Sequence, residues 1–433
     1  MSTTSSSQRA GYALFIIGVL FFIFGFVTWL NGTLIQYLKL VCQLKTDVQA
    51  FLVTSAFYMA YFFLALPSAF ILQKTGYKNG MALGLLVMAL GALLFIPAAN
   101  ARSFPLFLVG LFIQASGLSL LQTASNPYVS VLGPIDSAAQ RMSIMGICNK
   151  MAGGVAPLIL SALVLGNAAI IDKQLQTTTD PHLRETLLTE LAGRIQPMYI
   201  VMTVVLALLA LMIRLSKLPE IQSTEDATGD AVDRSSVLQY PYLLLGVVCI
   251  LVYVGAEVLV GDYIGPFGRA EGMSLGETGH FTTYPMIAML VGYITGIITI
   301  PKYLSQQAAL KICAISGLVF TIGVLTTHGY IAIGFITLLG LSNSLMWPAI
   351  WPLALNGLGR FTKIGSALLI MGIVGGALLP QCYAWLKDVQ HVPNGLAYCG
   401  CLFPCYAYIL YYALAGHKAG RRKAKVVPLS SRA

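Results

Sequence analysis

Long apolar runs alternate with short polar segments along almost the whole of the 433-residue chain. Most runs have the length of about 20 residues that an α-helix needs to cross a lipid bilayer. Several runs are longer, which indicates tilted or kinked helices. The pattern predicts an all-α membrane protein with twelve transmembrane helices, over residues 11–38, 48–72, 79–99, 104–132, 143–170, 197–215, 240–264, 279–301, 311–328, 330–357, 364–386 and 395–415.

The longest polar stretch in the middle of the chain is rich in acidic residues and separates two sets of six helices. We therefore expect an N-terminal bundle over 1–215, a cytoplasmic linker over 216–239, a C-terminal bundle over 240–416 and a basic cytoplasmic tail over 417–433. A short repeat indicates that the halves are related, because Ile144–Ile147 of helix five recurs as Ile370–Ile373 of helix eleven. Two pseudo-symmetric six-helix bundles with a site between them are typical of transporters.

The composition agrees with this class, since 57% of the residues are hydrophobic and only 10% are charged. Soluble domains carry about 25% charged residues, so the lipid bilayer is the expected environment. The net charge of +10 is scattered over helix ends and forms no stripe for nucleic acid. The cysteines lie mostly in apolar runs and the histidines in loops or at helix ends, so we expect no disulfide scaffold and no metal site. No phosphate-binding loop motif occurs, which excludes a built-in ATPase, and we expect no cofactor.

The distribution of basic residues predicts the orientation of the chain in the membrane. With the N-terminus in the cytoplasm, the inner segments hold 17 of the 26 lysines and arginines, and the outer segments hold eight. Basic residues near the ends of spans favour the cytoplasmic side. Both termini are therefore expected to be cytoplasmic.

Three charged residues fall inside apolar runs, where a charge is costly and hence a functional candidate. Lys150 is on helix five, and Glu257 and Asp262 are on helix seven. Glu257 is the stronger candidate for a group that couples transport to a cation, with a structural ion pair to Lys150 as the alternative. Asp262 is closer to the helix end, so an interfacial or capping role competes with cation binding.

Neutral polar and aromatic residues in the spans form a second set of candidates. Amides supply hydrogen-bond donors and acceptors, and tryptophan supplies a flat apolar face, which together suit a monosaccharide. Single amides also serve as contacts between helices, so this alternative stays open. The expected sugar-binding residues are Asn31, Gln122, Asn126, Asn149, Lys150, Asn343, Trp347 and Trp351.

These residues stand within segments that resemble the major facilitator superfamily, specifically its fucose permease-type sugar transporters. The motifs FGFVTWLNG and IMGICNK are similar to those of the N-acetylglucosamine and glucose transporter branch. The resemblance implies alternating access, with two bundles rocking about a central sugar site, and symport with H⁺ or Na⁺ in a bacterial inner membrane. It extends over nearly the whole chain, with its strongest passages at Phe22–Leu34, Gly117–Gly133, Arg141–Gly154, Tyr253–Val258, Leu345–Gly359 and Gly365–Pro380.

Three positions depart from the fucose permease pattern. Gly32 stands where that family member has an aspartate, Gln122 where it has a glutamate, and Gly146 where it has a glutamine. Both carboxylates of the family's proton mechanism are therefore absent, whereas sugar binding through Asn31, Gln122 and Asn149 carries over.

We therefore expect a monomeric importer of N-acetylglucosamine or a glucose-type hexose, coupled to Na⁺ or H⁺ through Glu257. An uncoupled sugar facilitator is the alternative. A non-transporting sugar sensor and a membrane-embedded enzyme are remote alternatives, because no output domain and no catalytic constellation stand out.

Overall fold

A computed structural model describes residues 3–132, 138–165, 174, 177, 180–216, 218, 236–300 and 302–420, and every regular element in these ranges is a helix. Most of the predicted linker, the end of helix five at 166–170 and the tail from 421 lie outside the described residues. The first half comprises α1 (Thr3–Trp29), α2 (Asn31–Val41), α3 (Asp47–Ala50), α4 (Leu52–Leu93), α5 (Phe95–Asn100), α6 (Phe104–Val131), α7 (Ala138–Leu160), the π-helix η2 (Ser161–Leu165), α9 (Pro181–Gly193) and α10 (Gln196–Leu215).

The described part of the second half is also built of helices. It comprises η3 (Val237–Gln239), α11 (Pro241–Asp262), α12 (Ile264–Ala270), α13 (Leu275–Thr278), α14 (Thr283–Thr299), α15 (Gln306–Thr326), α16 (Gly329–Asn343), α17 (Met346–Leu355), η4 (Gly359–Phe361), α18 (Thr362–Met371), η5 (Gly372–Val374), α19 (Gly375–Asp388), α20 (Asn394–Leu414) and η6 (Gly416–Lys418).

Eleven helical stretches of the described chain are long and apolar enough to cross a membrane, and one of them contains two spans. That stretch runs from Asp47 to Asn100 over 54 residues, or ~81 Å at ~1.5 Å per residue, about twice the thickness of a bilayer. The chain turns at Gly76, whose φ of 74° favours glycine. The reversal lies within residues 73–78, the interval that the hydropathy pattern leaves between spans two and three.

The first and the tenth span are each broken along their length. The first divides at Leu30 into α1 and α2, which the hydropathy pattern does not reveal. The tenth divides at Ser344 and Leu345 into α16 and α17. The ring of Pro348 clashes with the carbonyl group four residues earlier in a continuous helix, which explains why the break falls at Ser344.

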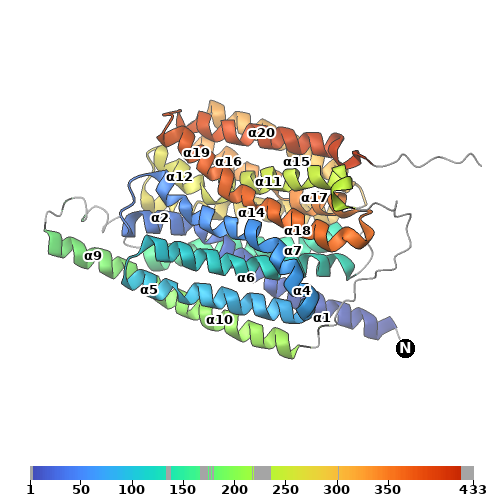
Figure 1. The fold of residues 1–433 in the computed structure, drawn as a ribbon. Helices are drawn as coiled ribbons and strands as arrows, with labels where there is room; N and C mark the ends of the chain where they lie inside the picture. The colour runs from blue at the N-terminus through green and yellow to red at the C-terminus, as the bar shows by residue number, and fades with distance from the viewer. Residues whose placement is uncertain are drawn as a thin grey trace, which may run out of the picture.

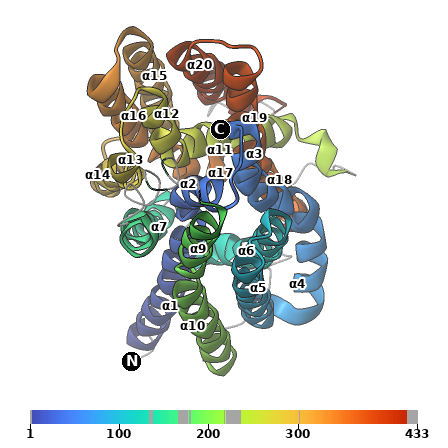
Figure 2. The same ribbon diagram turned by 90° about the vertical axis from the view of Figure 1, so that its left-hand side faces the viewer.

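The helices form two bundles, which Figure 2 shows end-on, with α1 to α10 in one half and α11 to α20 in the other. Within the first bundle α1 packs on α7 and α4 on α6, and within the second α11 packs on α19 and α15 on α20. Across the interface α7 packs on α14, and α4 packs on α18 and α19. The fifth span thus contacts the eighth and the eleventh contacts the second, as expected for two related halves.

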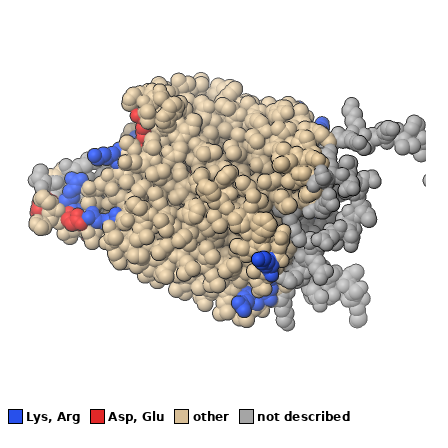
Figure 3. Space-filling model, viewed as in Figure 1, with Lys and Arg blue, Asp and Glu red and all other residues tan. Residues whose placement is uncertain are grey.

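Charged side chains gather at the two ends of the molecule, and a broad uncharged band lies between them (Figure 3). The two described ends of the chain lie at the same end of the bundles (Figure 1), which we call the termini face. The opposite end carries α2, α3 and α12, and we call it the Asp47 face. An apolar band with charges at its two rims is the surface expected of a protein that spans a bilayer.

Candidate functional site

A central cavity of about 720 Å³, part of it open to solvent, lies between the two halves. Both bundles supply the walls, which combine aromatic rings, amides and one pair of opposite charges. The lining residues are Phe21, Phe24, Thr28, Trp29, Tyr58, Tyr61, Gln122, Asn126, Met142, Gly146, Asn149, Lys150, Tyr253, Val254, Glu257, Tyr293, Trp347 and Ile373.

The pair of charges joins the two halves across the cavity. Lys150 Nζ of α7 donates to Glu257 Oε1 of α11 over 2.9 Å, and the two side chains are only 5% and 12% exposed. Lys150 Nζ also lies 3.9 Å from the centroid of the Trp29 ring, a cation–π contact. The structure therefore contains the ion pair that the sequence left as an alternative role for Glu257.

Trp29 is held in place by small residues on both sides. A Cβ atom on Gly153 of α7 would lie 2.5 Å from Trp29 Cδ1, and Gly261 of α11 packs against the other end of the ring. Trp29 Nε1 donates to Asn149 Oδ1 over 3.2 Å, and Asn149 Nδ2 donates to the Phe21 carbonyl over 3.4 Å. The indole is therefore a fixed wall of the cavity, and α1 presents it because the helix ends there.

The amides of α6 form another part of the cavity wall. Gln122 Nε2 donates to the hydroxyl group of Tyr61 over 3.1 Å, and Asn126 lies one turn further along the same helix. Gln122 keeps part of its side chain accessible, whereas Asn126 is almost fully buried. Both residues line the cavity, so α6 offers amide groups to a ligand that has hydroxyl groups.

In the second half, α17 supplies Trp347 to the cavity. Its ring stacks on that of Trp351 with centroids 5.3 Å apart, and it lies 6.3 Å from the ring of Tyr253. Trp351 is behind Trp347 and does not line the cavity. Asn343 also lies away from it, because its Oδ1 accepts a hydrogen bond from the Tyr406 hydroxyl over 2.9 Å.

Asn31 and Asp262 lie beside the cavity, where the two halves meet, and neither lines it. Asp262, the last residue of α11, accepts a hydrogen bond through Oδ1 from the Gly32 amide of α2 over 3.1 Å. This contact corresponds to the interfacial role that the sequence analysis gives for Asp262 as the alternative to cation binding. Of the predicted residues, the cavity brings together Gln122, Asn126, Asn149, Lys150, Glu257 and Trp347.

Several aromatic residues of the cavity escaped the sequence reasoning. Tyr58 and Tyr61 are three residues apart on α4, and Tyr253 precedes Glu257 by one helical turn. Aromatic residues at these spacings share a helix face, and Tyr253 shares its face with a charged residue. This spacing is the feature of the sequence from which they could have been predicted to line the cavity. Tyr293 could be found only from the fold, because it packs over Gly146, where a Cβ atom would lie 2.6 Å from its Cε1.

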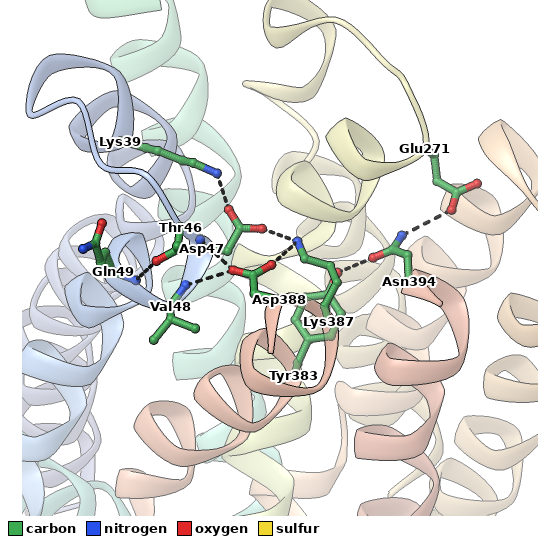
Figure 4. A network of polar contacts seen from close by, with 10 residues as sticks. All are labelled: Lys39, Thr46, Asp47, Val48, Gln49, Glu271, Tyr383, Lys387, Asp388 and Asn394. Atoms are coloured by element: carbon green, nitrogen blue, oxygen red, sulfur yellow. Dashed lines mark hydrogen bonds and ion pairs between the residues drawn. The ribbon is translucent and has the colours of Figure 1, made fainter. Parts of the chain in front are cut away.

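The Asp47 face is closed by a polar network between the halves (Figure 4). The carboxylate of Asp47 on α3 pairs with Lys39 of the same half and with Lys387 of α19 in the other half. Asp388 Oδ2 accepts from the Asp47 and Val48 amides over 2.9 Å and 3.4 Å, so it caps α3 from across the interface. We call Lys39, Asp47, Lys387 and Asp388 the Asp47 network.

Further contacts between the halves lie toward the same face. Thr54 and Tyr263 share a hydrogen bond through their hydroxyl groups, and Gln381 Nε2 donates to Ser55 Oγ over 3.0 Å. Among the described residues, no group of three or more His, Cys, Asp or Glu side chains is arranged to hold a metal ion. The site is therefore built of amides, aromatic rings and one ion pair, below a face where the halves touch.

Two related helical bundles around a central polar cavity define a membrane transport protein of the alternating-access type. The family model of the Major Facilitator Superfamily matches residues 14–380, and the chain belongs to this superfamily. Its members in this branch are permeases for sugars, so the chain is a transporter and not an enzyme.

The relatives extend over nearly the full length of the chain. A glucose/galactose transporter of Brucella abortus is 36% identical over 423 residues, which cover 96% of this chain and 97% of the relative. The L-fucose-proton symporter of Escherichia coli is 30% identical over 413 residues, covering 91% and 90%. The crystal structure of the transporter FucP in its outward conformation superposes with a TM-score of 0.75 at 28% identity, covering 94% of this chain and 98% of that one.

Proposed function

We propose that the protein imports a neutral hexose of the glucose or galactose type by alternating access, coupled to the entry of a cation. The observation that supports this most is the composition of the cavity. Amides on α6 and α7 line it together with the aromatic rings of Trp29 and Trp347. Sugars bind through hydroxyl groups that need donors and acceptors and through ring faces that stack on aromatic side chains.

The ion pair in the cavity favours an uncharged substrate. Lys150 and Glu257 compensate each other at 2.9 Å, so a charged sugar would add an unpaired charge to a poorly solvated site. The names of the relatives support the same class of substrate, since they are called glucose/galactose transporters and L-fucose-proton symporters. N-acetylglucosamine, which is also neutral, is the competing substrate.

The proposed coupling ion is H⁺ or Na⁺, and the candidate carriers are Glu257 and Asp262. The two carboxylates are the buried acidic groups that the structure describes within the spans near the cavity. A facilitator without a coupling ion remains the alternative, favoured by the fact that Glu257 is already neutralised by Lys150. Cofactors are not required by either mechanism.

We place the protein in the inner membrane of a bacterium as a monomer, with both termini in the cytoplasm. The orientation is supported by basic residues at helix ends on the termini face, such as Arg214 in the last turn of α10 and Lys418 in η6. The Asp47 face instead mixes both signs of charge. An excess of lysine and arginine marks the cytoplasmic side.

Uptake into proteoliposomes tests the proposal. Labelled glucose, galactose and N-acetylglucosamine are offered under a proton gradient, a sodium gradient and no gradient, with protein-free liposomes as the control. We expect accumulation of a hexose above equilibrium under one of the two gradients. Equilibration without accumulation would favour the facilitator, and absence of any hexose transport, including exchange, would contradict the proposal.

A further inference from the structure

Asp262 is a buried carboxylate at the interface between the halves, and it forms no ion pair with a basic side chain that the structure describes. It is 0% exposed, and its Oδ2 atom has no hydrogen-bond partner among the described residues. Its Oδ1 atom accepts from the amide of Gly32, one of the first amides of α2, which the break at Leu30 leaves free. The side-chain amide nitrogen of the neighbouring Asn31 is also buried without a partner.

The charges around Asp262 do not balance if all of them are ionised. The charged or titratable groups that act on it are Lys150 from α7, Tyr58 from α4, and Glu257 and Tyr263 from its own segment. The sole cation among these, Lys150, is already committed to Glu257 at 2.9 Å. One negative charge is therefore left over at a position that is 0% exposed, and binding a cation there removes the cost of the buried bare charge.

A proton suits the surroundings of Asp262 better than a metal ion does. Metal cations take several oxygen ligands at once, whereas a proton needs a single carboxylate oxygen. The partner that the structure gives Asp262 is an N–H group, which cannot bind a metal cation, and α2 faces it with the uncharged Gly32 amide. Oδ2 stays available to carry the proton.

The Gly32 contact links Asp262 to the state of the Asp47 face. Gly32 belongs to the first bundle and Asp262 to the second, so their hydrogen bond exists only while the halves touch there. The approach depends on glycine, because a Cβ atom at position 32 would lie 2.6 Å from Thr282 Oγ1 and 3.0 Å from Asp262 Cα. An amide donor at a helix N-terminus stabilises a carboxylate more than a neutral carboxyl group.

We propose that Asp262, and not Glu257, carries the coupled proton, and that the Gly32 contact releases it. When the Asp47 face is open, the contact is absent and a proton from the water on that side forms an O–H bond at Asp262. When the face closes around the sugar, the Gly32 amide favours the ionised carboxylate. The O–H bond then breaks and the proton leaves on the other side. One proton moves per sugar, and the Lys150–Glu257 pair stays intact.

This inference rests on the proposed sugar transport, so the test separates the two. Wild-type protein in proteoliposomes is assayed for hexose accumulation driven by a proton gradient, for proton entry per sugar in weakly buffered medium, and for sugar exchange without a gradient. Asp262→Asn should exchange sugar but reach only equilibrium, without proton entry. Glu190→Gln removes an exposed carboxylate of α9 and serves as the matched control, which should accumulate sugar like the wild type.

The possible results are distinct. If the wild type exchanges no hexose, the proposed function fails. If it exchanges hexose but a sodium gradient alone drives accumulation, or no proton enters with sugar, the proton assignment is overturned. If Asp262→Asn still accumulates sugar with one proton each, the assignment to Asp262 is overturned.

A second variant keeps the inference testable if Asp262→Asn does not fold. Gly32→Ala retains the carboxylate but pushes α2 away from it. We expect this variant to keep proton-driven accumulation while shifting the pH at which transport is half-maximal, because the contact that favours the ionised form is weakened. An unchanged pH profile in Gly32→Ala would overturn the role of the contact.

Discussion

The buried ion pair between Lys150 and Glu257 yields the most quantitative prediction. At the observed separation of 2.9 Å, two unit charges attract by about 6 kcal/mol if the effective dielectric constant is about 20. Most of this offsets the cost of removing both charges from water. Replacing one partner leaves the other charge buried alone, so Lys150→Met or Glu257→Leu should each lower the free energy of unfolding by about 3–5 kcal/mol.

The groups around the ion pair also predict which single variant lowers the free energy of unfolding more. After Glu257→Leu, Lys150 keeps its cation–π contact with Trp29, 3.9 Å from the ring centroid, and its attraction to Asp262. After Lys150→Met, Glu257 and Asp262 lose the cation that attracts both carboxylates. We therefore expect Lys150→Met to be the more destabilising change. The double variant should recover most of the loss, because it removes both charges together.

The assay is the free energy of unfolding in mixed detergent micelles, followed by circular dichroism for the wild type, both single variants and the double variant. The exposed pair of Arg194 and Glu190 is the control, because its separation of 2.8 Å is similar but Glu190 is 58% exposed. Its variants should cost less than about 1 kcal/mol. A double variant that costs the sum of its two single variants would refute the reasoning.

Three further predictions concern the cavity and its closure. Asp47→Asn removes the carboxylate that Lys39 and Lys387 share, so the population open at the Asp47 face should grow by about 5–30-fold, corresponding to ~1–2 kcal/mol. Spin labels at positions 45 and 390 should report this as longer distances between the labels. An unchanged distribution of label distances would contradict the prediction. Trp29→Ala removes the wall beside Lys150, and calorimetry should show sugar affinity weakened by about 10–100-fold, with Trp29→Phe milder. Gly146→Ala should displace Tyr293 and slow sugar exchange, whereas Gly154→Ala should be tolerated, because its nearest neighbour would be 3.8 Å away; equal rates in the two variants would contradict the packing argument.

Hydropathy predicted the spans well because the bilayer imposes the same length on each of them. The details that failed depend on the backbone of single residues. The break at Leu30 has no proline or glycine at that residue to indicate it. The break before Pro348, by contrast, follows from the sequence once the clash with the preceding turn is considered.

The candidate site was predictable in part, because a polar residue in an apolar run must face either a cavity or a partner. The sequence could not distinguish these two outcomes. Gln122 and Asn149 face the cavity, whereas Asn343 meets Tyr406 and Asp262 meets Gly32. Which outcome applies depends on how helices from distant parts of the chain are rotated against one another.

Gly32 illustrates what only the fold could add. The sequence shows this position as the loss of a carboxylate, relative to fucose permease. In the structure the carboxylate of Asp262 occupies the space beside it, since Asp262 Oδ1 would be 3.1 Å from a Cβ atom at position 32. An aspartate at position 32 would place two carboxyl groups together in a buried site, where they would disfavour each other's ionisation.

The position of Trp29 makes intrinsic tryptophan fluorescence a probe of the cavity. Of the four tryptophans in the chain, Trp29 and Trp347 line the cavity and Trp351 stacks behind Trp347, while Trp385 is largely exposed on α19. Two of the four tryptophans thus lie within contact distance of a bound ligand. Emission from Trp29 further depends on the Lys150 ammonium group above its ring and on the contacts of the ring with Gly153 and Gly261, one from each bundle. A change in the tilt between the bundles should therefore alter the fluorescence of the unlabelled protein, so the working cycle can be followed in time without attaching a dye.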